Sequence, residues 1–245
     1  MLVHSTRHPQ WLSNSWLIAD KIGGDAILID SGGPSSRIDN YLDDNNLTLR
    51  HVLCTHHHYD HVENNDHYRQ KYCCEVCAHS NEVNLIDGAV SELIHNQILS
   101  CGGLEVRCLH IPGHTSGQLA FYVNGEVLFT GDTLFAGSIG GTQGPDHTSF
   151  EDLQHSLFDV LFALPDSTVV YPGHMQATTL SEELATNPFV RAFQGKDVVR
   201  ERDCEVMGIA AKLMLRAADY DGGTKCWVRS TDGIDDIVAG SQVKS

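Results

Sequence analysis

The sequence has little positive charge for its length. It holds 16 Lys and Arg residues against 32 Asp and Glu residues, which gives a formal net charge of −16 at pH 7. Neutralising the phosphates of a nucleic acid requires clustered Lys and Arg side chains. The excess of acid therefore argues against a nucleic-acid partner.

Long hydrophobic runs are also missing. No stretch approaches the roughly 20 apolar residues that a membrane-spanning helix needs, and residues 1–10 lack a basic segment followed by an apolar one. We therefore expect a cytoplasmic protein with no membrane partner. The eight cysteines are few for 245 residues and come without an export signal, so we expect them to be reduced.

What the sequence does contain is enough apolar material for one sizeable core, since 41% of its residues are hydrophobic. Short apolar stretches separated by turn residues predict strands. Two of them flank Asn124-Gly125, a dipeptide typical of a hairpin. Residues 149–152 resemble a capping box, and leucines at helical spacing follow, which predicts a helix of about 15 residues.

The pattern changes near residue 195. We interpret residues 1–195 as one catalytic domain of mixed strands and helices, and residues 196–245 as a short C-terminal extension. Within the extension, the apolar residues of 198–218 predict a helix and those of 225–229 a strand. This segment would serve as a cap or as a contact in a homo-oligomer.

Histidine is abundant, with 15 residues that nearly equal the cations in number, and this points to metal or proton chemistry. Residue types that bind metals occur where four predicted strands end. They are His56, His58, Asp60 and His61 after the first of these strands, and His114, Asp132 and His174 after the later ones.

Spacing within the first group favours two neighbouring ions. His56 and His58 are two residues apart on an extended segment, so their side chains point the same way and can converge on one ion. After the chain turns, Asp60 and His61 can bind a second ion nearby. The side chains of residues 57 and 59 should face away.

The donor types favour a reactive site over a structural one. Imidazole and carboxylate groups suit zinc, iron or manganese, and none of the seven candidates is a thiolate, so a closed structural zinc site is disfavoured. Two metals that share a carboxylate and a water lower the pKa of the water toward 7 and polarise a carbonyl or phosphoryl oxygen.

At these residues the chain resembles the metallo-β-lactamase superfamily, and within it the hydroxyacylglutathione hydrolase (glyoxalase II)-like branch. The motifs of that branch are met in order by Thr55–His61 (T-H-x-H-x-D-H), Pro112–Thr115 (P-G-H-T), Gly131–Phe135 (G-D-T-L-F) and Gly173-His174 (G-H). The resemblance covers residues 10–195. It implies an α/β fold, an αββα sandwich, with the site at the edge of its two sheets.

The resemblance also implies a ligand set and an activity. It assigns His56, His58 and His114 to metal 1, Asp60, His61 and His174 to metal 2, and Asp132 to a bridging position. The implied cofactors are two divalent ions, with zinc favoured over iron and manganese. The implied reaction is hydrolysis of a small thioester or related acyl compound by metal-bound hydroxide, which Asp60 would also orient as the candidate catalytic residue.

Departures from the branch concern the substrate. Glutathione-hydrolysing members carry a cationic residue shortly after G-D-T-L-F, whereas residues 136–143 contain neither Lys nor Arg. Members also tend to place a tyrosine two residues after the last histidine, where this chain has Gln176. A glutathione carboxylate would lose its expected anchor unless Arg191, Lys196 or Arg229 replaced it, so we expect a different thioester or ester.

Three other functions stay open. A mononuclear iron persulfide dioxygenase would use His56, His114 and Asp132, but the Arg-containing segment of those enzymes is replaced by residues 140–143, which lack Arg. A lactonase would use the same ligands. The third is a catalytically idle, metal-bound scaffold with its partner surface in residues 196–245.

Overall fold

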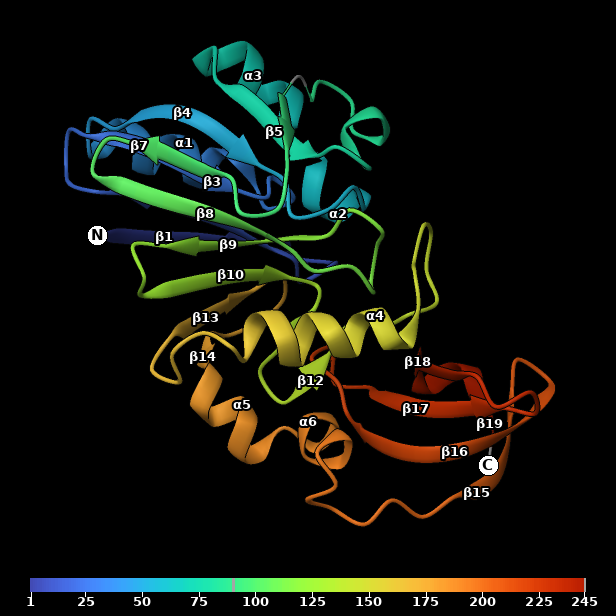
Figure 1. Cartoon of the computed structure of the whole chain (residues 1–245). Helices are drawn as coiled ribbons and strands as arrows, with labels where there is room; N and C mark the ends of the chain where they lie inside the picture. Colours follow the sequence, from blue (N-terminus) through green and yellow to red (C-terminus); the bar gives the residue numbers. More distant parts are fainter. Residues whose placement is uncertain (90, 245) are drawn as a thin grey trace.

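The computed structural model describes residues 1–89 and 91–244, and these fold into layers around two six-stranded sheets (Figure 1). In spatial order the first sheet consists of β1 (Leu2–Arg7), β2 (Asn14–Ala19), β3 (Asp25–Ile29), β4 (Thr48–Leu53), β5 (Glu75–His79) and β6 (Ser91–Leu93). The second consists of β14 (Thr178–Thr179), β13 (Val169–Pro172), β10 (Val127–Gly131), β9 (Leu119–Val123), β8 (Leu104–His110) and β7 (Ile98–Cys101). Strands β3 to β6 are parallel, as are β10 and β13.

Helices cover the outer faces of both sheets. The helical segments are α1 (Ser35–Asp44), α2 (Tyr59–Val62), α3 (Asn65–Tyr72), η1 (Val83–Leu85), α4 (Phe150–His155), η2 (Ser156–Leu161), α5 (Leu180–Thr186), α6 (Pro188–Phe193) and η3 (Gly240–Gln242). Residues of α1 and α3 pack on the first sheet, and residues of α4, α5 and α6 pack on the second. Between the sheets lies a third apolar layer, to which both contribute. This is the αββα sandwich that the family resemblance implied.

Two local predictions are confirmed. Asn124 and Gly125 join β9 to β10 with φ values of 52° and 71°, as the type I′ turn of a tight hairpin requires. At the start of α4 the hydroxyl of Ser149 accepts from the backbone N–H of Asp152, and the Asp152 carboxylate accepts from the backbone N–H of Ser149. The helix that follows continues through η2, a π-helical turn.

The predicted helix over residues 198–218 is wrong. The C-terminal segment forms a five-stranded antiparallel sheet, in the order β18 (Asp235–Ala239), β17 (Thr224–Ser230), β16 (Ile209–Ala218), β15 (Arg202–Val206) and β19 (Val243–Lys244). Both faces of this sheet carry apolar residues: Leu213 faces the core of the sheet itself, while Met214 packs with α4 and its neighbours. Because the neighbouring Leu213 and Met214 are both buried, residues 213–215 form a short continuous apolar run, which periodicity alone does not distinguish from part of a helix.

A further short ribbon, β11 (Leu134–Phe135) and β12 (Ser138–Ile139), follows β10 and lies next to the C-terminal sheet (Figure 1). Among the described residues, no helix combines the length and the apolar character that crossing a membrane requires.

Candidate metal centre

Four strands deliver the candidate ligands to one rim of the sandwich. β4 of the first sheet ends just before the group that begins at His56, while β8, β10 and β13 of the second sheet end just before His114, Asp132 and His174. All seven side chains that the sequence singled out come together there in overlapping groups of donor atoms.

Three imidazoles form the first group. The Nδ1 atom of His58 lies 3.1 Å from Nε2 of His56 and 3.1 Å from Nε2 of His114. Nitrogen lone pairs that converge in this way, from three different directions, can hold one metal ion.

A carboxylate and two imidazoles form the second group. Oδ2 of Asp60 lies 3.5 Å from Nε2 of His61 and 3.6 Å from Nε2 of His174. The side chain of Asp60 is 15% exposed, against 0% for His61 and 3% for His174, so the carboxylate lies on the open side of the group.

Asp132 lies between the two groups. Its Oδ2 atom is 3.7 Å from Nε2 of His114 in the first group and 3.2 Å from Nε2 of His174 in the second. Its Oδ1 atom is 3.4 Å from Nε2 of His61. One carboxylate therefore reaches both groups, which is the position that a ligand shared by two ions would occupy.

The buried donor atoms fit metal ions. Nε2 of His61 and Oδ1 of Asp132 are buried and have no hydrogen-bond partner among the described residues, although buried polar atoms are normally paired. Gly173 leaves the space open, because a Cβ at that position would lie 2.2 Å from Oδ1 of Asp132. The His and Asp clusters could therefore hold divalent metal ions.

The charge states suit the same role. Burial lowers the pKa of His114 to about 4 and that of His56 well below its usual value, so both imidazoles are neutral near pH 7, as metal ligands must be. Burial alone would raise the pKa of Asp132. The nearby His174 and His61 outweigh that effect and hold the pKa well below its usual range.

Asp30 fixes the orientation of one candidate ligand. This residue follows β3 with a φ of 56°, and its Oδ2 atom lies 2.8 Å from Nδ1 of His61 and accepts from the hydroxyl of Thr55 at 2.8 Å. Its Oδ1 atom accepts from the backbone N–H of Thr55 at 2.7 Å. A carboxylate that accepts from Nδ1–H leaves Nε2 free to face the centre.

Contacts with backbone carbonyls position two other candidate ligands, His114 and His174. Nδ1 of His114 lies 3.0 Å from the carbonyl oxygen of Gly141, within the stretch after G-D-T-L-F. The side-chain amide of Asn14 donates to the carbonyls of Pro172 and Met175, on either side of His174. The candidate ligands His114 and His174 are therefore positioned by partners from different parts of the chain.

The two side chains predicted to face away do so. Nδ1 of His57 lies 3.1 Å from Oε2 of the buried Glu82, and Tyr59 is 58% exposed. Glu82 also accepts from the hydroxyl of Thr115 and the backbone N–H of Gly117. This buried carboxylate ties the first histidine cluster to the segment that follows His114, and no sequence motif indicated it.

The three cations considered as substitutes for a glutathione anchor are engaged elsewhere. Arg191 forms an ion pair with Asp197 at 2.7 Å and Arg229 one with Asp235 at 2.9 Å, while the ammonium of Lys196 approaches the carbonyl of Leu184 at 3.5 Å.

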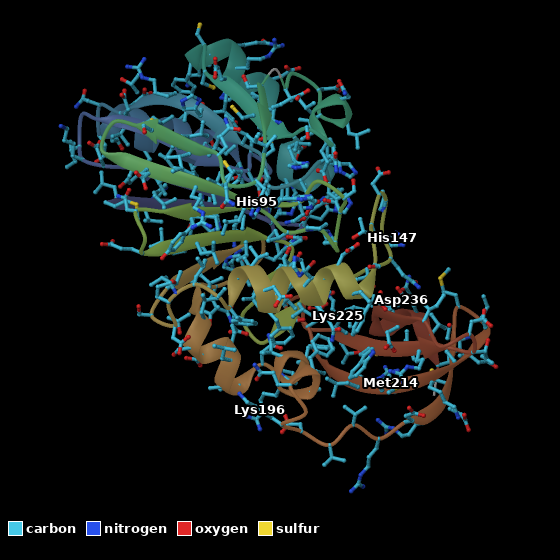
Figure 2. The ribbon with its side chains drawn as sticks, viewed as in Figure 1. His95, His147, Lys196, Met214, Lys225 and Asp236 are labelled. Carbon is cyan, nitrogen blue, oxygen red and sulfur yellow. The ribbon has the colours of Figure 1, made fainter. Side chains whose placement is uncertain are left out.

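A cation that the sequence did not single out lies beside the stretch after G-D-T-L-F. Lys225 of β17 donates to the carbonyl of Ile139 at 2.9 Å and pairs with Asp219 at 3.2 Å, and both side chains of the pair are more than nine-tenths buried. Figure 2 shows Lys225 where the C-terminal sheet meets the rest of the chain. Its charge is therefore neutralised internally.

The C-terminal sheet also holds the following part of this stretch. Asp236 of β18, labelled in Figure 2, accepts from Thr142 at 3.1 Å and from Gln143 at 3.0 Å. The backbone N–H of Thr142 donates to the carbonyl of Ile237. Since the neighbouring Gly141 carbonyl contacts His114, the sheet supports the first group of donors indirectly.

We expect Asp30→Asn to weaken metal binding by about 10- to 100-fold, because the change removes the charged acceptor that fixes the tautomer of His61. Competition with a chromophoric chelator measures this affinity. Asp39→Asn is the matched control, since Asp39 also accepts from a histidine, His67, but lies away from the centre. Equal affinities in the two variants would contradict the role of Asp30.

Comparison with known proteins places these observations in a family. Residues 8–174 match the family model described as the metallo-beta-lactamase superfamily. A hydroxyacylglutathione hydrolase of Pelagibacter ubique is 38% identical over 162 residues, which cover 65% of this chain and 65% of that protein. A probable polyketide biosynthesis zinc-dependent hydrolase, BaeB of Bacillus velezensis, is 33% identical over 69% of this chain and 76% of its own length.

Among solved structures, ETHE1 from Myxococcus xanthus is similar with a TM-score of 0.70 and 28% sequence identity. The superposition covers 82% of this chain and 93% of that one.

Proposed function

Because the chain belongs to the metallo-β-lactamase superfamily, we propose that it is a metal-dependent hydrolase that binds two divalent ions and cleaves an acyl thioester. Zinc is the favoured metal, supported by the relative described as a zinc-dependent hydrolase. The observation that carries the proposal is the pair of donor groups joined by Asp132, since a centre for one ion would need only one group.

Two ions at these positions would lower the pKa of a shared water toward 7 and polarise the carbonyl of the acyl group. The carboxylate of Asp60 is more exposed than that of Asp132, so Asp60 can accept a hydrogen bond from that water and orient it. Asp30 and the Gly141 carbonyl keep the ring nitrogens of His61 and His114 directed at the centre. A thiol leaves readily as its anion, since its pKa is about 8.5, so no further acid is needed.

The lack of an unpaired Lys or Arg side chain in residues 136–143 favours a thioester other than one of glutathione. Residues 136–143 carry no Lys or Arg, and Lys225, which reaches this stretch, is paired with Asp219. An anionic group of the substrate would find no unpaired Lys or Arg side chain along this stretch. We therefore propose a substrate whose acyl and thiol parts are neutral near the site.

A mononuclear iron persulfide dioxygenase is the second candidate, favoured by the similarity to ETHE1. It would use His56, His114 and Asp132. The group of Asp60, His61 and His174 argues against it, because one iron would leave those three converging donors without a role.

Metal quantification combined with a substrate panel tests the proposal. Protein loaded separately with zinc, iron or manganese is assayed on a thioester, a lactone and a phosphodiester, and for persulfide-dependent oxygen uptake. We expect two ions per chain and fastest turnover of the thioester.

Other results would replace the proposal with a named alternative. One iron per chain together with persulfide-dependent oxygen uptake would establish the dioxygenase. Preference for the lactone would establish a lactonase. Metal-loaded protein that turns over none of the compounds would support the scaffold.

A further inference from the structure

Tyr220 brings the C-terminal sheet into contact with the candidate metal centre. It lies in the loop of residues 219–223 that joins β16 to β17, the hairpin that points toward β12 in Figure 1. Its ring stacks on the imidazole of His174, with centroids 4.3 Å apart and 16° between the planes. The ring of Phe135 packs against it at 4.8 Å. A residue far along the chain thus covers a donor of the second group.

The loop is anchored firmly enough to hold this position. Asp219 accepts from the hydroxyl of Ser138 at 2.8 Å and from the backbone N–H of Tyr220 at 2.9 Å. The ammonium of Lys225 pairs with Asp219 and lies 5.3 Å from the ring centroids of both Phe135 and Tyr220. The ring of Tyr220 is therefore fixed on two sides by groups that are themselves buried.

The hydroxyl of Tyr220 is left available. Within the described part of the chain it forms no hydrogen bond, and it is not among the side-chain atoms that are fully buried without a partner. A tyrosine with most of its ring packed normally finds a partner for its hydroxyl, and the stacking of this ring on His174 places the residue at the edge of the second group of donors.

Building on the proposed function, we propose that Tyr220 is a substrate-binding residue: its ring forms the wall beside His174, and its hydroxyl donates a hydrogen bond to the acyl part of a bound thioester. The C-terminal sheet is then part of the substrate site.

The test compares Tyr220→Phe, Tyr220→Ala and the control Tyr41→Phe. Tyr41 stacks on His4 in the same manner, with centroids 3.9 Å apart and 9° between the planes, but in a different part of the fold. The probe is S-butyryl-N-acetylcysteamine, a neutral acyl thioester. We expect Tyr220→Phe to raise KM about fivefold, the cost of one lost hydrogen bond, with kcat little changed. Tyr220→Ala should raise KM further, and Tyr41→Phe should behave as the wild type.

Metal content and ligand binding separate the outcomes. Unchanged KM in both Tyr220 variants, or loss of metal from Tyr220→Phe, would overturn the substrate contact while leaving the proposed function intact. Absence of thioester turnover by the wild type would overturn the proposed function. Calorimetric binding of the amide analogue of the probe, in which NH replaces the thioester sulfur, to the metal-loaded proteins then decides the contact: weaker binding by Tyr220→Phe supports it, and equal or undetectable binding overturns it.

Discussion

Asp132→Ala is expected to lower metal content below two ions per chain and to reduce turnover about a thousandfold. Within residues 1–89 and 91–244, Asp132 is the one carboxylate with contacts of 3.7 Å or less to donors of both groups, so its loss separates the two candidate ion positions. A pair of ions stabilises developing charge by several kcal/mol, and each 1.4 kcal/mol or so is worth tenfold in rate. Metal analysis by mass spectrometry and steady-state kinetics measure the two effects.

Asp159→Ala is the matched control. Its carboxylate is 69% exposed and pairs with His155 on the surface of the helix, so neither metal content nor turnover should change. An Asp132→Ala protein that retains two ions and wild-type turnover would refute the bridging role, and with it the proposed two-metal centre.

Lys225→Met is expected to lower the free energy of unfolding by about 3–5 kcal/mol, the usual cost of leaving one charge of a buried pair without its partner. The side chains of Lys225 and Asp219 are 9% and 8% exposed, so water cannot replace the lost ammonium. The change also removes the hydrogen bond to the Ile139 carbonyl. Denaturant unfolding followed by circular dichroism measures the difference.

Two further variants test whether the loss of stability comes from the buried pair. Lys212→Met removes an exposed lysine that pairs with Asp203 on the same sheet, and should leave stability unchanged because exposed pairs contribute little. In a Lys225→Met, Asp219→Leu double variant the unpaired charge is gone, so part of the stability should return. A single variant as stable as the wild type would show that the buried pair does not hold the C-terminal sheet in place.

The gathering of the seven donors at strand ends could be predicted because it depends on local signals, whereas the αββα sandwich was implied by the resemblance of four motifs to a known family. Strand ends are marked by turn residues, and the spacing of His56 and His58 fixes the direction of two side chains along one extended segment. The parallel strands then bring distant strand ends to one rim.

The C-terminal sheet could not be predicted in the same way. Met207 and Gly208, with φ values of 49° and 84°, form the tight turn between β15 and β16, but only the glycine signals a break in an apolar run. A register shift between Leu213 and Leu215 further obscures the alternation expected of a strand. The stacking of Tyr220 on His174 depends on how that sheet docks, and no sequence spacing encodes it.

The placement of the donors on two sheets couples metal affinity to folding. His56 to His61 follow a strand of the first sheet, whereas His114, Asp132 and His174 follow strands of the second. Ions bound there would close a long loop of the chain and cross-link the halves of the sandwich, favouring the native state by an amount that grows with the logarithm of the free metal concentration. The protein's resistance to unfolding would then depend on the metal supply of its surroundings.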